Sequence, residues 1–113
     1  MLTGNPKFFH LHLVSDATGE TLTAMSKAVT VQYPGIRAIE HIHPLVRTKR
    51  QLNRVCQIIE AQPGIVLHTI INSELSAELD KLCSELNIPS IAILNPILQV
   101  FGSYLGAPSE PTV

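Results

Sequence analysis

The stretch SDATGET, residues 15–21, combines hydroxyls, carboxylates and one glycine between an apolar run and a stretch with helical spacing. The free N–H groups at a helix start favour anions, and Gly19 would allow the backbone to approach a phosphate closely. Hydroxyl groups that could donate hydrogen bonds to such a group come from Ser15, Thr18 and Thr21. These residue types predict a phosphate-handling loop.

Two acids in the same stretch complicate this interpretation. Asp16 could position Mg²⁺ through its carboxylate, act as a catalytic base or cap the helix. Asp16 and Glu20 would both repel a bare phosphate unless a metal or a lysine intervened. The competing interpretation is an Asp-initiated turn that leads into a capped helix, with Gly19 only permitting the turn. Residue spacing alone leaves both interpretations open.

A basic cluster follows a second apolar stretch, in LVRTKRQLNR. Arg47, Lys49 and Arg50 could bind phosphate or a protein substrate, and arginine could do so through two parallel hydrogen bonds. The alternative is a solvated helix face that carries Arg50 and Arg54 outward. Net charge is −1, which points neither to nucleic acid nor to an anionic membrane.

The five histidines favour structural roles. His10 and His12 share one side of a predicted strand, and His41 and His43 share one side of the next. Brought together, the four would resemble a metal site, but no carboxylate or cysteine joins them at ligand spacing. We therefore predict packed or surface histidines and no metal site. His68 lies nearer the expected cleft, where a lone strand histidine is more often structural.

Composition predicts one folded domain. The chain has 113 residues, of which 45% are hydrophobic and 15% charged, enough to bury a core without disulfides. Cys56 and Cys83 fall in apolar helical patterns and are interpreted as reduced core thiols of a cytoplasmic protein. No run is long enough to span a bilayer, and the N-terminus lacks the features of a signal peptide.

Hydrophobic periodicity alternates between strand and helix four times. Predicted strands cover residues 9–14, 36–46, 64–71 and 88–95. The intervening apolar stripes are Leu22-Met25-Val29, Leu52-Val55-Cys56-Ile59, Leu75-Leu79-Leu82-Leu86 and Ile97-Leu98-Phe101-Tyr104-Leu105.

Helix boundaries are marked by local signals. Thr48 and Gln51 form a capping box, Asn72 or Ser73 can cap the third helix, and Asn87 can end it. Asn95 is expected to cap the last helix, with Pro96 in its first turn. Phe101 and Tyr104 would pack that helix against the sheet or a partner.

Four successive βα units predict an α/β fold with three layers, Rossmann-like or flavodoxin-like, around a mainly parallel four-stranded sheet. We expect the strand order 2-1-3-4. Ligands then bind beyond the carboxyl ends of the first and third strands, where strand order reverses. Residues 15–21 and the turn at 71–73 would line that cleft.

Four segments in order, FHLHLVSDATGETL, PLVRTKRQLNRV, GIVLHTI and LNPILQVFGSYLG, resemble the N-terminal part of one family. It is the regulatory protein family of pyruvate, phosphate dikinase, which includes relatives that act on phosphoenolpyruvate synthase. The resemblance covers nearly the whole chain, and SDATGET is its most specific part.

The resemblance implies a bifunctional serine/threonine kinase and phosphorylase. It would phosphorylate a dikinase threonine with ADP and remove the group with inorganic phosphate, with Mg²⁺ as a further candidate. The family's nucleotide loop lies in its C-terminal half, and this sequence contains neither G-x-G-x-x-G nor G-x-x-x-x-G-K-[ST]. Residues 1–106 would thus form the N-terminal domain, and residues 107–113 would form a tail or the start of a linker. The chain by itself would be inactive.

Two alternatives are compatible with the same residues. The chain could be a non-catalytic recognition or dimerisation module, with the apolar helix 96–106 as its interface and a homodimer as one outcome. It could also be a free-standing domain that binds a small phosphate ligand. Within the family interpretation, the protein partner is pyruvate, phosphate dikinase or phosphoenolpyruvate synthase.

Overall fold

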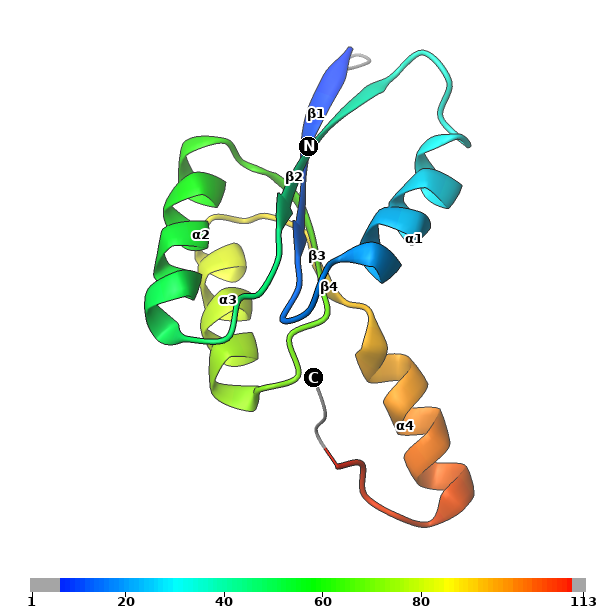
Figure 1. Cartoon of the computed structure of the whole chain (residues 1–113). Helices are drawn as coiled ribbons and strands as arrows, with labels where there is room; N and C mark the ends of the chain where they lie inside the picture. Colours follow the sequence, from blue (N-terminus) through cyan, green and yellow to red (C-terminus); the bar gives the residue numbers. More distant parts are fainter. Residues whose placement is uncertain (1–6, 111–113) are drawn as a thin grey trace.

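The computed structural model describes residues 7–110, so the outermost residues of the predicted domain and tail, 1–6 and 111–113, lie outside it. Strands and helices alternate (Figure 1). The strands are β1 (Phe8–Val14), β2 (Arg37–His43), β3 (Gly64–His68) and β4 (Ser90–Ala92). The helices are α1 (Glu20–Thr30), α2 (Lys49–Ala61), α3 (Ser73–Glu85) and α4 (Leu94–Leu105). Among residues 7–110, no helix combines the length and apolar character needed to cross a bilayer.

The sheet has the order β2-β1-β3-β4, and every pairing is parallel. Helices α2 and α3 cover one face, and α1 lies on the other (Figure 1). This arrangement confirms the predicted α/β class and strand order. All four strands end at one edge of the sheet, which we call the carboxyl edge, so the loops that follow them gather there.

The α2/α3 face holds the larger core. Leu52, Val55 and Ile59 are buried along α2, as their spacing predicts. The predicted capping box is present, since the Thr48 side chain accepts from the Gln51 N–H and Gln51 reaches back to the Thr48 N–H. Each such cap typically stabilises a helix by about 1 kcal/mol.

Helix α3 begins and ends at the predicted signals. Asn72 caps it through its side chain, which accepts from the Leu75 N–H. At the other end Asn87 has a positive φ of 56°. The N–H groups of Asn87 and Ile88 bond back to the carbonyls of Ser84 and Cys83, which is a Schellman motif.

The opposite face is covered less completely. Leu11 and Leu13 of β1 pack with Leu22 of α1. The predicted stripe on α1 is wrong beyond Leu22, because Met25 and Val29 are 37% and 54% exposed. One turn after Leu22, the buried residue of α1 is Ser26, which hydrophobic periodicity does not detect. Its hydroxyl donates to the carboxylate of Glu40 on β2.

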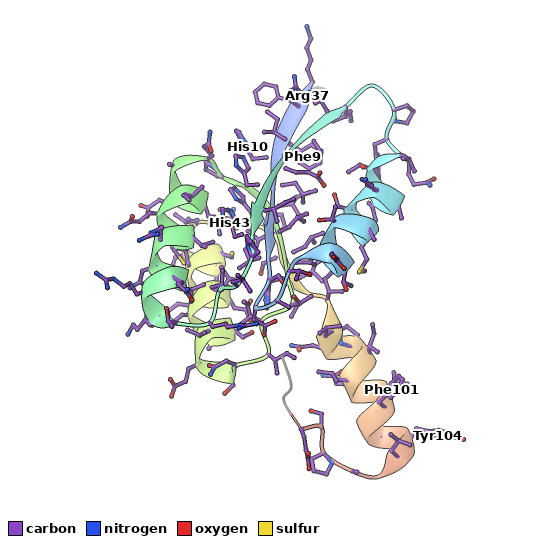
Figure 2. The ribbon with its side chains drawn as sticks, viewed as in Figure 1. Phe9, His10, Arg37, His43, Phe101 and Tyr104 are labelled. Carbon is purple, nitrogen blue, oxygen red and sulfur yellow. The ribbon has the colours of Figure 1, made fainter. Side chains whose placement is uncertain are left out.

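Helix α4 departs furthest from expectation. It begins at Leu94, so Asn95 and Pro96 lie inside its first turn and Asn95 is not the cap. No residue of α4 is buried. Phe101 and Tyr104 extend from the helix away from the sheet (Figure 2) and are 59% and 89% exposed. Of the two predicted alternatives for these rings, packing on the sheet is wrong, because α4 runs past the carboxyl edge, and packing on a partner stays a prediction.

Three strands are shorter than predicted, and one of them, β4, covers only Ser90–Ala92 of the predicted 88–95. β2 ends at His43 and β3 at His68, where the chain turns into loops that bond to the β1–α1 loop. Strand β3 is not fully covered on its two faces, because the side chain of Ile65 is 36% exposed.

Candidate functional site

A concavity of about 180 Å³ opens at the carboxyl edge, as predicted. Residues 15–22 form most of its wall, joined by Thr69, Ile71 and Leu94. The predicted lining therefore holds for 15–21 and Ile71, but not for Asn72 and Ser73. Sequence reasoning missed Thr69 and Leu94. Thr69 could have been noticed, because it is the first hydroxyl residue after the third strand.

Ser15 joins two loops at the base of this concavity. It is 3% exposed, and its Oγ accepts from the Ala17 N–H at 3.0 Å, which tightens the β1–α1 loop. The Thr69 hydroxyl donates to the same oxygen at 3.3 Å. Because Ser15 Oγ already accepts two hydrogen bonds, its own proton is the part left for another acceptor.

Asp16 holds the β1–α1 loop to the loop after β3. Its side chain is largely buried, and Oδ2 accepts from the Ile71 N–H at 3.1 Å. On the other side, Arg47 Nε donates to the Asp16 carbonyl at 2.8 Å. Asp16 thus has a structural role that its sequence position does not reveal, because its partner lies 55 residues away.

The loop after β2 completes the support. The Leu45 N–H donates to the Ala17 carbonyl at 2.9 Å, and the Val46 N–H donates to the Ser15 carbonyl at 2.9 Å. Leu45 adopts a positive φ of 58°, a conformation that is costly for a residue with a branched side chain. The main chain between β1 and α1 is therefore held from both neighbouring loops.

Gly19 begins α1 with a left-handed conformation, at φ 87°. A side chain there would be strained and would meet Ile42 Cγ2 at 3.4 Å. No side chain caps α1. Thr18 Oγ1 reaches only the Glu20 N–H, at 3.5 Å. The first turn of α1 therefore faces the concavity without the side-chain cap that α2 and α3 carry.

The three basic residues separate in the structure. Arg47 lies against the loop through its bond to Asp16. Lys49 pairs with Glu78 of α3 at 3.2 Å, and Arg50 is exposed on α2. None of them lines the concavity, so any contact they make with a phosphate or a protein substrate would be at its rim. That role stays a prediction.

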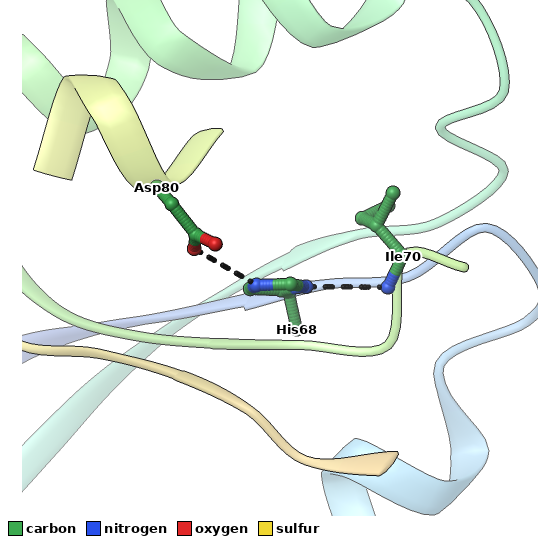
Figure 3. Close-up of polar contacts among 3 residues, drawn as sticks. All are labelled: His68, Ile70 and Asp80. Atoms are coloured by element: carbon green, nitrogen blue, oxygen red, sulfur yellow. Dashed lines mark hydrogen bonds and ion pairs between the residues drawn. The ribbon is translucent and has the colours of Figure 1, made fainter. Parts of the chain in front are cut away.

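His68 is structural, as expected. It is fully buried on the α2/α3 face of β3, with Nε2 3.3 Å from Asp80 Oδ1 (Figure 3). The Ile70 N–H donates to Nδ1 at 3.3 Å, which assigns the proton to Nε2. Burial lowers the pKa of His68, and the Asp80 carboxylate opposes that shift. His68 therefore fixes the turn that leads to Ile71.

The other four histidines form one cluster between β1 and β2, which we call the histidine quartet: His10, His12, His41 and His43. His10 Nδ1 lies 2.9 Å from His41 Nε2, and His12 Nδ1 lies 3.2 Å from His43 Nε2. The rings of His12 and His41 stack with centroids 4.6 Å apart. Among residues 7–110, no group of three or more suitable side chains could hold a metal ion. The stacked and hydrogen-bonded rings are packed against one another, and the absence of a metal site stays a prediction.

Both cysteines are free thiols in the α2/α3 core. Burial raises the pKa of Cys56 to about 11 and raises that of Cys83. They stay protonated at neutral pH and do not supply a nucleophile.

The bond from Ile71 to Asp16 predicts different outcomes for two substitutions. Asp16→Ala should lower the free energy of unfolding by about 1–3 kcal/mol, because it leaves a half-buried amide unpaired. Asp16→Asn keeps an oxygen that can accept and should cost less than about 1 kcal/mol. Urea unfolding followed by circular dichroism would measure both. Equal losses in the two variants would contradict the assigned acceptor role.

Comparison with known proteins adds to this geometry. A family model described as kinase/pyrophosphorylase matches residues 11–113. A Brucella anthropi protein, provisionally named a pyruvate, phosphate dikinase regulatory protein, is 55% identical over 103 residues. Proteins from Brucella ovis and Brucella canis with the same provisional name are 53% identical over 103 residues. Each alignment covers 91% of this chain and 37% of the relative, so the chain spans little more than a third of their length.

Proposed function

The chain belongs to the kinase/pyrophosphorylase family, and from this premise we propose that its carboxyl edge forms one wall of a phosphotransfer site in a regulator of pyruvate, phosphate dikinase. The observation that supports this most directly is the concavity at residues 15–22, where an uncapped helix start meets Ser15 and Thr18. The complete protein would transfer phosphate to a dikinase threonine with ADP as donor. It would also remove that phosphate with inorganic phosphate, releasing pyrophosphate. Phosphoenolpyruvate synthase is the alternative protein substrate.

The size of the concavity indicates which part of the chemistry it could hold. Pockets for drug-sized ligands usually measure about 300–1,000 Å³. A space of about 180 Å³ suits a phosphate group but not a whole nucleotide. ADP would therefore be held mainly by a part of the protein beyond this chain, and these residues would contact a phosphate.

Different groups at the concavity would contact different parts of the phosphate and the protein substrate. The N–H groups of the first turn of α1 and the hydroxyls of Thr18 and Thr21 would donate to phosphate oxygens. The exposed carboxylate of Glu20 would repel that phosphate unless a cation accompanies it. Arg47, Lys49 and Arg50 would contact phosphate or the protein substrate at the rim.

A metal ion fits this chain poorly by itself. One Asp16 oxygen already accepts from the Ile71 amide, and residues 7–110 contain no cluster of ligands for a metal. Mg²⁺ would need ligands from the nucleotide or from elsewhere in the protein. In the complete protein, Asp16 would act as the catalytic base.

Ligand titration of the 113-residue chain tests the phosphate wall. Phosphate, pyrophosphate and ADP would be added at millimolar concentration while backbone amide resonances are followed. We expect shifts centred on residues 18–22 with phosphate and pyrophosphate, and no larger response to ADP than to pyrophosphate. Sodium sulfate at matched ionic strength controls for salt. An intact spectrum without shifts in this segment would contradict the proposal.

The catalytic role of Asp16 needs a variant that preserves the loop. Asp16→Asn in the full-length protein keeps an acceptor for Ile71 and removes the charge, whereas Asp16→Ala also disturbs the loop. Loss of phosphotransfer in Asp16→Asn with an unchanged melting temperature would support a base or cation-binding role. Activity near that of the wild type would exclude it.

A recognition or dimerisation module is the second candidate function. The exposure of most of α4 favours it, because an apolar helix without a buried residue normally has a partner.

A further inference from the structure

The concavity at the carboxyl edge is lined by two acids and by no basic side chain. Asp16 and Glu20 belong to its lining, whereas no lysine, arginine or histidine of residues 7–110 does. Arg47 donates to the main-chain carbonyl of Asp16 and not to its carboxylate. An anion without a proton would therefore be repelled by two carboxylates that no cationic side chain of the lining offsets.

One carboxylate oxygen of Asp16 is free to accept a hydrogen bond. Asp16 is only 7% exposed, and its Oδ2 accepts from the Ile71 N–H at 3.1 Å. Among residues 7–110, nothing donates to the other oxygen, Oδ1. No buried side-chain nitrogen or oxygen of these residues lacks a partner, so Oδ1 must be open to the concavity that Asp16 lines. Because an ionised carboxylate can only accept, this atom calls for a donor on the ligand.

The other polar groups of the concavity can donate. The first turn of α1 has no side-chain cap for its N–H groups, and Thr18 and Thr21 add hydroxyls to the lining. The Oγ of Ser15 accepts from the Ala17 N–H and from the Thr69 hydroxyl, which leaves the Ser15 proton to donate. The concavity thus combines several donors with one buried acceptor.

A tetrahedral anion that keeps one proton matches this combination. Its oxygens would accept from the N–H and hydroxyl groups, and its own O–H would donate to Asp16 Oδ1. Hydrogen bonds from an O–H group to a carboxylate are among the stronger ones in proteins. We propose, as an extension of the phosphotransfer site described above, that Asp16 makes this concavity selective for free inorganic phosphate in a protonated form.

Such selection separates free phosphate from phosphate esters. At pH 8 inorganic phosphate is mostly a dianion that retains one proton. A phosphate monoester has a second pKa of about 6 and is then a dianion without a proton. Sulfate is also a dianion without a proton. The concavity would therefore hold the phosphate that removes the group from the dikinase threonine, and not the phosphorylated threonine itself.

Three anions of equal charge test the selection. Sodium phosphate, sodium sulfate and methyl phosphate would be titrated into the 113-residue chain at pH 8 and constant ionic strength, with backbone amide resonances of residues 15–22 as the readout. We expect phosphate to bind, and the dissociation constants of sulfate and methyl phosphate to be at least about 10-fold larger. Binding of either proton-free anion as tightly as phosphate would overturn the proposal.

Asp16→Asn changes the chemistry of the free atom. The new amide oxygen would keep the hydrogen bond from the Ile71 N–H, which turns the amide NH₂ group towards the concavity. A donor at this position favours anions without a proton. The dissociation constant of sulfate should then fall to about that of phosphate or below it. A sulfate-to-phosphate ratio unchanged from the wild type would contradict the role of Oδ1.

Glu20→Gln is the matched control for charge. It removes one negative charge from the same lining, at a side chain that is exposed. Both dissociation constants should decrease, and their ratio should stay within about 2-fold of the wild-type value. A ratio that falls as far as in Asp16→Asn would assign the selectivity to net charge and overturn the role of Asp16.

Selection by Asp16 presupposes the proposed phosphotransfer site, yet the two can fail separately. If none of the three anions shifts residues 15–22 in an intact spectrum, the proposed function is contradicted and the selection with it. If phosphate and sulfate shift these residues alike, the phosphate site stands and only the selection by Asp16 is wrong.

Discussion

Alanine in place of Gly64 is expected to lower the free energy of unfolding by about 3 kcal/mol or to prevent folding. Gly64 is paired with His10 in the central β1–β3 ladder. A Cβ atom there would lie 1.9 Å from the His10 carbonyl oxygen and 2.6 Å from its carbonyl carbon. Both atoms belong to the backbone, so relief requires two central strands to separate.

Gly35→Ala provides the matched control. Gly35 has a φ of 90° in an exposed turn, and a Cβ atom there meets nothing within 4 Å. The cost is then backbone strain alone, about 1–2 kcal/mol. Urea unfolding of both variants by circular dichroism gives the comparison. An equal loss of stability in the two variants would show that the close approach of Gly64 does not limit the fold.

Acidification should destabilise the protein through the histidine quartet. Burial, followed by the nearby His12 and His41, lowers the pKa of His43 from 6.5 to about 4. Burial also lowers the pKa values of His12 and His41. Between pH 6.5 and 4 the unfolded chain then binds more protons than the folded chain, so stability is complete above pH 6.5 and falls as the pH drops. His43 alone should account for about 3 kcal/mol.

The hydrogen bonds of the quartet give a geometric reason why the pKa values of its histidines are lowered. His12 Nε2 donates to the Gln62 carbonyl at 2.7 Å, so its Nδ1 must accept from His43 Nε2. Protonation of His43 alone would place the new proton on its Nδ1, but protonation of both rings would direct two N–H groups at each other. The stacked ring of His41 would bring a further positive charge close to both.

Denaturant unfolding across this pH interval measures the effect. His43→Gln should give a shallower decline than the wild type, because it removes the imidazole whose pKa is lowered to about 4 while leaving β2 in place. An unfolding free energy that is constant from pH 6.5 to pH 4 would contradict the assignment. A decline equally steep in His43→Gln would assign the acid sensitivity to other groups.

The parts of the fold that could be predicted are those marked by residues close together in the sequence. The capping box at Thr48 and Gln51 and the stop at Asn87 act within a few residues of themselves, so spacing revealed both. Alternation of strand and helix then required a parallel sheet with right-handed crossovers, which placed residues 15–21 at the carboxyl edge. By contrast, Pro63-Gly64 reads as a helix stop, and nothing in the sequence shows that Gly64 contacts the His10 carbonyl.

The sequence by itself determined the alternation of elements, the composition of the SDATGET loop and the family resemblance, because each depends on residue types at short spacing. Tertiary structure decided what those residues contact. The Asp16 carboxylate meets an amide 55 residues away, and Arg47 meets the Asp16 carbonyl. It also decided that Met25 and α4 stay exposed, since burial depends on which strand a helix covers and not on its own periodicity.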